Sequence, residues 1–205
     1  MDMRWFGIVL MGVFTLFWTS WAFGADVGAL TAIGAIFMAA GVALLLAAVT
    51  LVRRGFAPRN RGSGSESNVH TPTQDGSPHL RLLNFALFVE FVAIIVAVLI
   101  VRHIDAGLIQ PVIALIVGAH FAIFWFSPTT RHVLHLWMTA GGVAIGVAAI
   151  VAVLRDASPA VVHGWVGLAM SAITLTYGAS FVALLRSAPD LHRSRVGAAS
   201  VDSEA

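Results

Sequence analysis

Six long runs of apolar residues, separated by short polar stretches, dominate the chain. They cover roughly residues 5–23, 28–52, 82–101, 108–126, 133–154 and 160–185. Each run is close to the roughly twenty residues that a helix needs to cross the hydrocarbon core of a bilayer. The runs are continuous rather than alternating, and a backbone that faces lipid must satisfy its own hydrogen bonds, so each run is expected to be helical. The pattern predicts an all-α bundle of six transmembrane helices, arranged as three helical hairpins.

Composition supports an integral membrane protein. Of the 205 residues, 59% are hydrophobic and only 11% are charged, whereas a soluble domain of this length requires far more charged surface. The chain has no Cys, which excludes disulfides, thiolate metal sites and cysteine nucleophiles. Its net charge of +2 comes from a few basic loops and does not indicate nucleic-acid binding. We therefore interpret residues 1–205 as a single membrane domain whose main partner is the lipid bilayer.

Two polar segments depart from the apolar pattern. Residues 53–81, between the second and third runs, are rich in Arg, Gly, Ser and Pro, and residues 187–205 have a similar composition. Such segments bury too little apolar surface to compensate for the entropy lost on ordering. We expect a flexible cytoplasmic loop at 53–81 and a disordered cytoplasmic tail at 187–205.

The arginines predict the orientation, because the cytoplasmic ends of membrane spans carry an excess of basic residues. All twelve basic residues are Arg, and ten of them fall on one side if the N-terminus is cytoplasmic. The opposite side holds only Arg102 and Arg155, each close to an Asp. The sequence thus predicts a multi-pass protein of the cell membrane with both termini in the cytoplasm.

The first apolar run has a second interpretation, as a cleavable signal peptide. Arg4 precedes the run, and the sequence AFGAD at 22–26 has the small residues of a cleavage site. Cleavage there would leave five spans and place one terminus outside. That arrangement breaks the even pattern of hairpins.

Glu90 is the only carboxylate within the third run. A charge near the middle of a membrane costs at least ~2.5 kcal/mol, so such a residue usually faces the bundle and finds a partner. The third and fourth runs form a hairpin centred near Asp105; Glu90 lies fifteen residues before this centre and His120 lies fifteen after it. Because a helix rises by the same ~1.5 Å at every residue, the two lie at similar depth. Small residues around Glu90 (Ala86, Ala93 and Ala97) mark one helix face as the packed face. We predict that Glu90 and His120 meet inside the bundle, directly or through one water.

His135 enters the membrane from the same side as His120. Glu90, His120 and His135 are therefore the candidate ligand-binding or proton-relay residues, and they are also the side chains that could ligate a metal or haem. They lie on three separate runs without the spacing of a known metal motif, so we expect neither a metal nor a cofactor. A Glu–His hydrogen bond that fixes helix packing is the simpler interpretation. Tyr177, the only Tyr, is expected to be a packing hydrogen bonder.

One stretch carries a resemblance to known proteins. Residues 111–142, PVIALIVGAHFAIFWFSPTTRHVLHLWMTAGG, resemble a segment of small bacterial multi-pass membrane proteins that have an IVGxHF helix. Gly118, His120 and Phe121 match this motif, and the preceding helix carries an acid, here Glu90. Ala-Ile follows Phe121 where the family has Leu-Pro, so a helix kink is not implied. The resemblance implies a bacterial inner-membrane protein, but the family has no assigned activity.

Three classes of function follow from these observations. The first is a non-enzymatic membrane module that acts in assembly or regulation, with a homo-oligomer as one form of assembly. The second is a small proton-linked transporter or permease that uses Glu90 and His120, which requires a polar cavity reaching Glu90. The third is an enzyme, against which the sequence offers neither a nucleophile–base pair nor a phosphate-binding loop. We expect no catalytic residues.

Overall fold

The computed structural model describes residues 4–56, 78–126 and 132–201, and this part of the chain consists of helices and short turns. The helices are α1 (Arg4–Ser20), α2 (Gly28–Phe56), α3 (Pro78–Val101), α4 (Ile109–Phe126), α5 (Val133–Leu154) and α6 (Pro159–Val201), with 3-10 turns η1 (Trp21–Ala25) and η2 (Ala106–Leu108). Each of the six helices is long and apolar enough to cross a membrane. The predicted all-α fold with six spans is confirmed.

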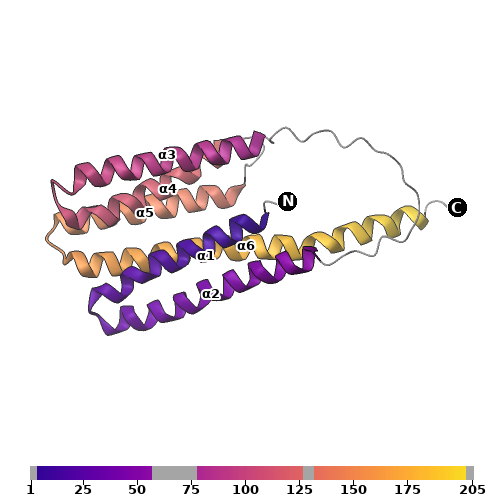
Figure 1. The fold of residues 1–205 in the computed structure, drawn as a ribbon, viewed down its shortest axis with the longest axis horizontal. Helices are drawn as coiled ribbons and strands as arrows, with labels where there is room; N and C mark the ends of the chain where they lie inside the picture. Colours follow the sequence, from indigo (N-terminus) through magenta and orange to yellow (C-terminus); the bar gives the residue numbers. More distant parts are fainter. Residues whose placement is uncertain (1–3, 57–77, 127–131, 202–205) are drawn as a thin grey trace.

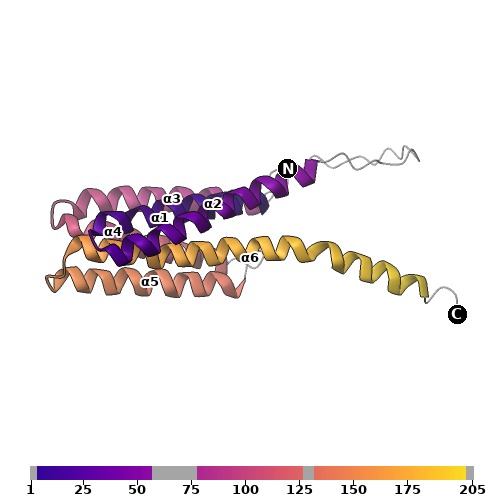
Figure 2. The ribbon, with the colours of Figure 1, turned by 90° about the horizontal axis from the view of Figure 1, so that it is seen from below.

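The helices form three antiparallel hairpins, α1–α2, α3–α4 and α5–α6. Figure 1 shows the three hairpin turns at one end of the molecule, with both termini at the other end. The central helix is α6, which packs against α1, α2, α4 and α5. The edge helix is α3, which packs mainly on α4 (Figures 1 and 2).

An Asp occupies each hairpin turn, and its role differs between turns. Asp26 and Asp156 adopt left-handed backbone conformations, with φ of 54° and 62°, which a short polar side chain tolerates better than most. Asp105 instead has an extended backbone, and its Oδ1 accepts a 2.8 Å hydrogen bond from the Gly107 amide. These local preferences explain why the chain reverses at the three predicted turns.

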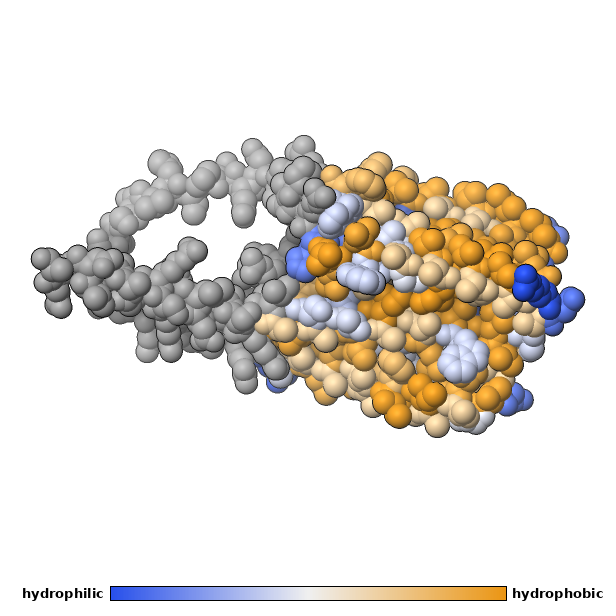
Figure 3. Space-filling view, turned by 180° about the vertical axis from the view of Figure 1, so that it is seen from behind, coloured by the Kyte–Doolittle hydropathy of each residue, from blue (hydrophilic) through white to orange (hydrophobic). Residues whose placement is uncertain are grey.

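The face of the bundle seen in Figure 3 is largely apolar between its two ends. The clearest case is α3, whose exposed large side chains include Phe85, Phe88, Phe91, Ile95, Val96 and Leu99. A soluble monomer does not expose continuous apolar surface on this scale. These side chains are placed to contact lipid, and only a narrow face of α3 contacts protein.

Glycines bring selected helices into close contact. A Cβ added to Gly118 of α4 would lie 2.5 Å from the backbone of Gly142 of α5, and one added to Gly146 would lie 2.7 Å from the backbone of Leu115. A Cβ on Gly167 of α6 would likewise meet the carbonyl oxygen of Trp18 in α1. In lipid, where burial of apolar surface does not drive helices together, such close packing is a main source of attraction.

The polar segments differ from the prediction at their edges. The end of α2 at Phe56 and the start of α3 at Pro78 are helical, and residues 57–77 of the predicted loop lie outside the described residues. Helix α6 continues past Ser187 to Val201, where a disordered tail was predicted. A span that is already helical removes the cost of nucleation, and the Ala, Leu and Arg residues that follow favour continuation.

Candidate functional site

Glu90 of α3 and His120 of α4 lie side by side within the bundle. Oε2 of Glu90 is 3.5 Å from Nδ1 of His120, and the two residues are 8% and 9% exposed. This separation is longer than a good hydrogen bond, and Nδ1 of His120 has no hydrogen-bond partner at this geometry. The two residues therefore form a close carboxyl–imidazole contact without a direct hydrogen bond.

The face of α3 that carries Glu90 is built from small residues. Ala86, one turn before Glu90, is fully buried, and its backbone also interacts with the His120 imidazole. Ala93 and Ala97 are half-buried on the same face, as the sequence predicts. Because these side chains are short, α4 approaches closely enough for its imidazole to reach the carboxyl group.

Aromatic rings surround His120 on its own helix. The rings of Phe121 and Phe124 contact the imidazole edge-on, at centroid distances of 5.7 and 5.3 Å. Phe124 also contacts the imidazole of His135, at 5.4 Å. The two histidines are thus connected through an apolar ring, which cannot transfer a proton between them.

His135 of α5 is directed to α6 instead of to Glu90. Its Nδ1 lies 3.1 Å from the Tyr177 hydroxyl, and Tyr177 packs its ring against Phe121 and Phe181. The expected role of Tyr177 as a packing hydrogen bonder is confirmed. Among the described residues, no group of three or more His, Cys, Asp or Glu side chains is placed to hold a metal ion. Glu90, His120 and His135 therefore do not form the three-ligand site considered from the sequence.

The His135–Tyr177 pair could have been found from the sequence, because both residues are equally far from the turn of their hairpin. His135 lies twenty-one residues before Asp156, at the turn of the α5–α6 hairpin, and Tyr177 lies twenty-one residues after it. This is the same relation that Glu90 and His120 have to Asp105. Sequence reasoning applied the relation to one hairpin and missed the second pair.

A second polar contact lies between α1 and α6. The hydroxyls of Thr15 and Thr174 are 2.9 Å apart, and those of Thr19 and Ser171 are 2.8 Å apart. All four residues are buried. The i, i+4 spacing of Thr15 and Thr19 places both on one helix face, and this spacing is the feature of the sequence that indicates a polar contact there. These pairs fix the register of α1 against α6.

Near the hairpin turns, two hydrogen bonds join η2 and the start of α4 to α6. Nε2 of His163 lies 2.8 Å from the Gly107 carbonyl oxygen, and Nε2 of Gln110 donates a 3.0 Å hydrogen bond to the His163 carbonyl oxygen. The His163 ring also packs edge-on against Trp21, at 5.4 Å. The sequence analysis did not identify Gln110, which is buried. His163 thus joins the turn regions of the α1–α2 and α3–α4 hairpins to α6.

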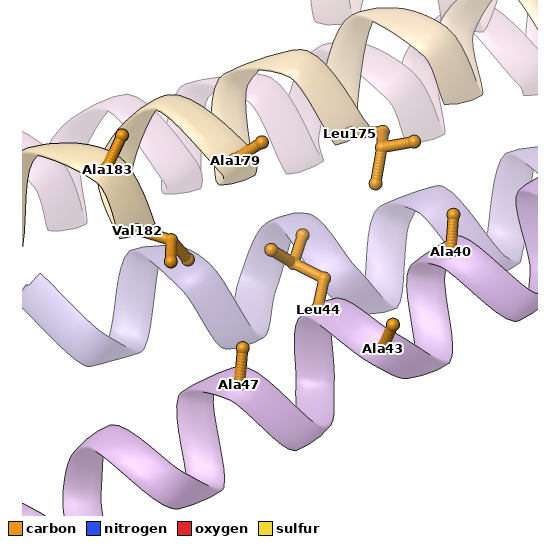
Figure 4. Close-up of a pocket in the computed structure, with 8 residues that line it drawn as sticks. All are labelled: Ala40, Ala43, Leu44, Ala47, Leu175, Ala179, Val182 and Ala183. Carbon is orange, nitrogen blue, oxygen red and sulfur yellow. The ribbon is translucent and has the colours of Figure 1, made fainter. Parts of the chain in front are cut away.

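An apolar groove of about 340 Å³ runs between α2 and α6 (Figure 4). Its walls include Ala40, Ala43, Leu44 and Ala47 of α2 and Ala179 and Val182 of α6. Glu90 and His120 are on the other side of the bundle, on α3 and α4, and neither lines this groove. The groove is therefore not the polar cavity that a proton-linked transporter requires.

No protein-family model, no curated protein and no solved structure matches this chain.

Proposed function

We propose that the protein is a non-enzymatic module of the bacterial inner membrane in which the Glu90–His120 contact holds the edge helix α3 against the bundle. The observation that carries this proposal is the buried 3.5 Å contact between α3 and α4. In this proposal, the module acts in assembly or regulation within the membrane.

The position of α3 explains why one polar contact matters. It packs mainly on α4, and most of its large side chains are exposed on the lipid-facing surface. Lipid tails are as apolar as these side chains, so their burial against protein gains little. The Ala face and the carboxyl–imidazole contact are then the specific interactions of α3. A helix attached in this way is suited to exchange its contact for one with a partner, including a second copy of the chain.

The other chemically capable side chains support a packing role. His135 contacts Tyr177, and Gln110 and His163 join α4 to α6. Each contact joins one helix to another, and the described residues include no metal-binding cluster. This distribution favours a structural module over an enzyme.

A proton-linked transporter is the second candidate. Ionisable residues within a membrane commonly mark proton pathways, and Nδ1 of His120 faces Glu90 without a hydrogen-bond partner. A carboxyl and an imidazole at this distance need only a small approach to exchange a proton. This observation keeps the transporter as a testable alternative.

Two substitutions at Glu90 test the packing role. Glu90→Gln keeps a polar group of nearly the same shape, so the melting temperature in detergent should change little. Glu90→Leu leaves Nδ1 of the buried His120 imidazole without a polar neighbour, at an expected cost of about 1–3 kcal/mol in unfolding free energy. Val92→Leu, at an exposed position on the same helix, serves as the control. Equal stability of Glu90→Leu and the wild type would contradict the proposal.

A flux measurement tests the transporter alternative. The wild type and Glu90→Gln would be reconstituted into liposomes that contain a pH-sensitive dye, and proton entry would be followed under an imposed membrane potential. Uptake by the wild type that is lost in a folded Glu90→Gln variant would favour the transporter, because an amide cannot titrate. Equal uptake in liposomes with and without the wild-type protein supports the packing role.

A further inference from the structure

Helix α5 begins with a histidine cap. The backbone of His132 is extended, and its Nδ1 accepts a 3.1 Å hydrogen bond from the Leu134 amide. The carbonyl oxygen of His132 accepts a second bond, of 2.9 Å, from the His135 amide. His132 therefore satisfies two of the amides that the start of a helix leaves without a partner inside the helix.

The cap depends on the protonation state of the His132 imidazole. A ring nitrogen accepts a hydrogen bond only while it carries no proton, so the cap requires a neutral ring with its proton on Nε2. A doubly protonated ring would direct an N–H toward the Leu134 amide, and its positive charge would lie at the positive end of the helix dipole. Asn, Ser and Thr, which commonly cap helices, do not titrate, whereas the charge of histidine changes between about pH 5 and pH 8.

The capped turn carries a contact to the central helix. His135 lies in this turn, and its Nδ1 is 3.1 Å from the Tyr177 hydroxyl of α6. The His132 and His135 rings are nearly perpendicular, with their centroids 6.5 Å apart. Because His135 takes its position from the first turn of α5, a change in the cap alters how its ring meets Tyr177.

Few other titratable groups face His132. Helix α5 packs against α4 and α6, and against η2 at its other end. The titratable side chain of α4 is His120, which lies beyond the Phe124 ring, and the one that α6 presents near this end is Tyr177. Arg131 precedes His132 in the sequence and stays charged at every pH considered. Of the imidazoles at this end of the described bundle, His132 is the exposed one.

We propose that His132 makes the start of α5 sensitive to pH on its side of the membrane. The neutral imidazole caps the helix and holds the first turn, whereas protonation releases the cap and loosens the His135–Tyr177 contact. The stabilisation is present at high pH and is lost as the pH falls. Helix α5 begins at the end of the bundle opposite the hairpin turns (Figure 1). This end is the predicted cytoplasmic side, so the device responds to acidification of the cytoplasm.

Amide hydrogen exchange in the purified full-length protein tests this proposal. Exchange of the Leu134 amide would be followed by NMR in detergent from about pH 8 to about pH 5, the range in which histidine titrates. His132→Asn caps the helix without titrating. Dividing the wild-type rate by the rate of this variant at each pH removes the intrinsic pH dependence of exchange. The ratio should rise about fivefold as the pH falls, because loss of an N-cap shifts the opening of the first turn by about that factor.

Tyr177 reports whether the change reaches α6. It is the only Tyr in the chain, so tyrosine labelled with carbon-13 at Cζ gives a single NMR signal. This signal should change over the same pH range as the Leu134 exchange in the wild type and stay constant in His132→Asn. His132→Ala, which removes the cap at every pH, should show fast exchange and the low-pH Tyr177 signal throughout. His132 is exposed, so both substitutions leave the bundle folded.

Four results would overturn the proposal. The ratio of exchange rates could stay constant from high to low pH, or His132→Ala could exchange no faster than the wild type at high pH. A Tyr177 signal that titrates equally in the wild type and in His132→Asn would assign the response to His135 instead of to the cap. A cap that responds while the Tyr177 signal stays constant would remove the link to α6. None of these results bears on the Glu90–His120 contact, which joins α3 to α4.

Discussion

Gly118 is the position at which α4 and α5 are packed most tightly. A methyl group there would lie 2.5 Å from the Gly142 backbone, so the helices would have to separate. We expect Gly118→Ala to cost about 1–3 kcal/mol of unfolding free energy, as overpacking usually does. This exceeds the ~0.6 kcal/mol of an average interhelical hydrogen bond in a membrane, so the loss should be greater than for Thr15→Val.

Gly7 provides a matched control for this prediction. It also lies within a transmembrane helix, but a methyl group at Gly7 would have nothing within 4 Å. Both substitutions improve helix propensity, and only Gly118→Ala introduces a clash. Melting temperatures of the two variants in detergent would test the difference. A Gly118→Ala variant at least as stable as Gly7→Ala would show that α4 and α5 are not packed at this distance.

At the scale of residues, the proximity of Glu90 and His120 could be inferred from the sequence. Their common depth follows from the constant rise of a helix and from the turn at Asp105, and the Ala positions indicate which face of α3 packs. Both inferences use contacts within one hairpin. The partner of Thr15 could not be inferred in this way, because Thr174 lies 159 residues away and the two helices share no turn.

At the scale of elements, hydropathy locates the spans but does not show which spans are neighbours in the bundle. The predicted and observed spans agree closely in extent because lipid imposes a length on every span. Their neighbours depend instead on which face of each helix carries small or polar side chains. The central position of α6 follows from Gly167, Ser171, Thr174 and Gly178, which pack against α1 and α2. Hydropathy averaged over the span does not show this face, but the i+3 and i+4 spacing of the four residues does.

The α1–α6 contact leads to a cross-linking prediction. The chain has no native Cys, so Thr19→Cys with Ser171→Cys creates a single thiol pair at positions whose hydroxyls are 2.8 Å apart. Mild oxidation of membranes should join these residues efficiently. Val13→Cys with Thr176→Cys, both at exposed positions on the same two helices, should not be joined. The products would be resolved by cutting the polypeptide within residues 57–77 before electrophoresis under non-reducing conditions.

The same experiment tests whether α1 is retained. Trp18 is 1% exposed and packs with α6, so removal of α1 would uncover the central helix of the bundle. If the first span were cleaved as a signal peptide, residue 19 would be absent and no cross-link to residue 171 would form. Sequencing the N-terminus of the membrane-bound protein would then place it near residue 25. A cross-linked product of full length would contradict cleavage.

At the scale of the whole molecule, the even number of spans and the arginine distribution together predict one orientation. Helix α1 begins and helix α6 ends away from the three hairpin turns, which predicts that both termini are on one side of the membrane (Figure 1). Arg102 and Arg155 lie near the turns, whereas Arg4, Arg53 and Arg81 lie on the described helices toward the opposite end of the bundle. Basic residues are retained in the cytoplasm, which favours the orientation with both termini inside.

We therefore predict that reporters placed at residue 65 and after residue 205 are both cytoplasmic. A fluorescent protein that folds only in the cytoplasm should be active at both sites, whereas a phosphatase that requires the oxidising periplasm should be inactive at both. Fusions at residue 104, next to a hairpin turn, should show the reverse and serve as the internal control. Replacing both Arg53 and Arg54 with Gln should leave the orientation unchanged, because eight arginines still favour it against two. Phosphatase activity at residue 65 or at the C-terminus of the wild type would show that the bundle is inverted or has an odd number of spans.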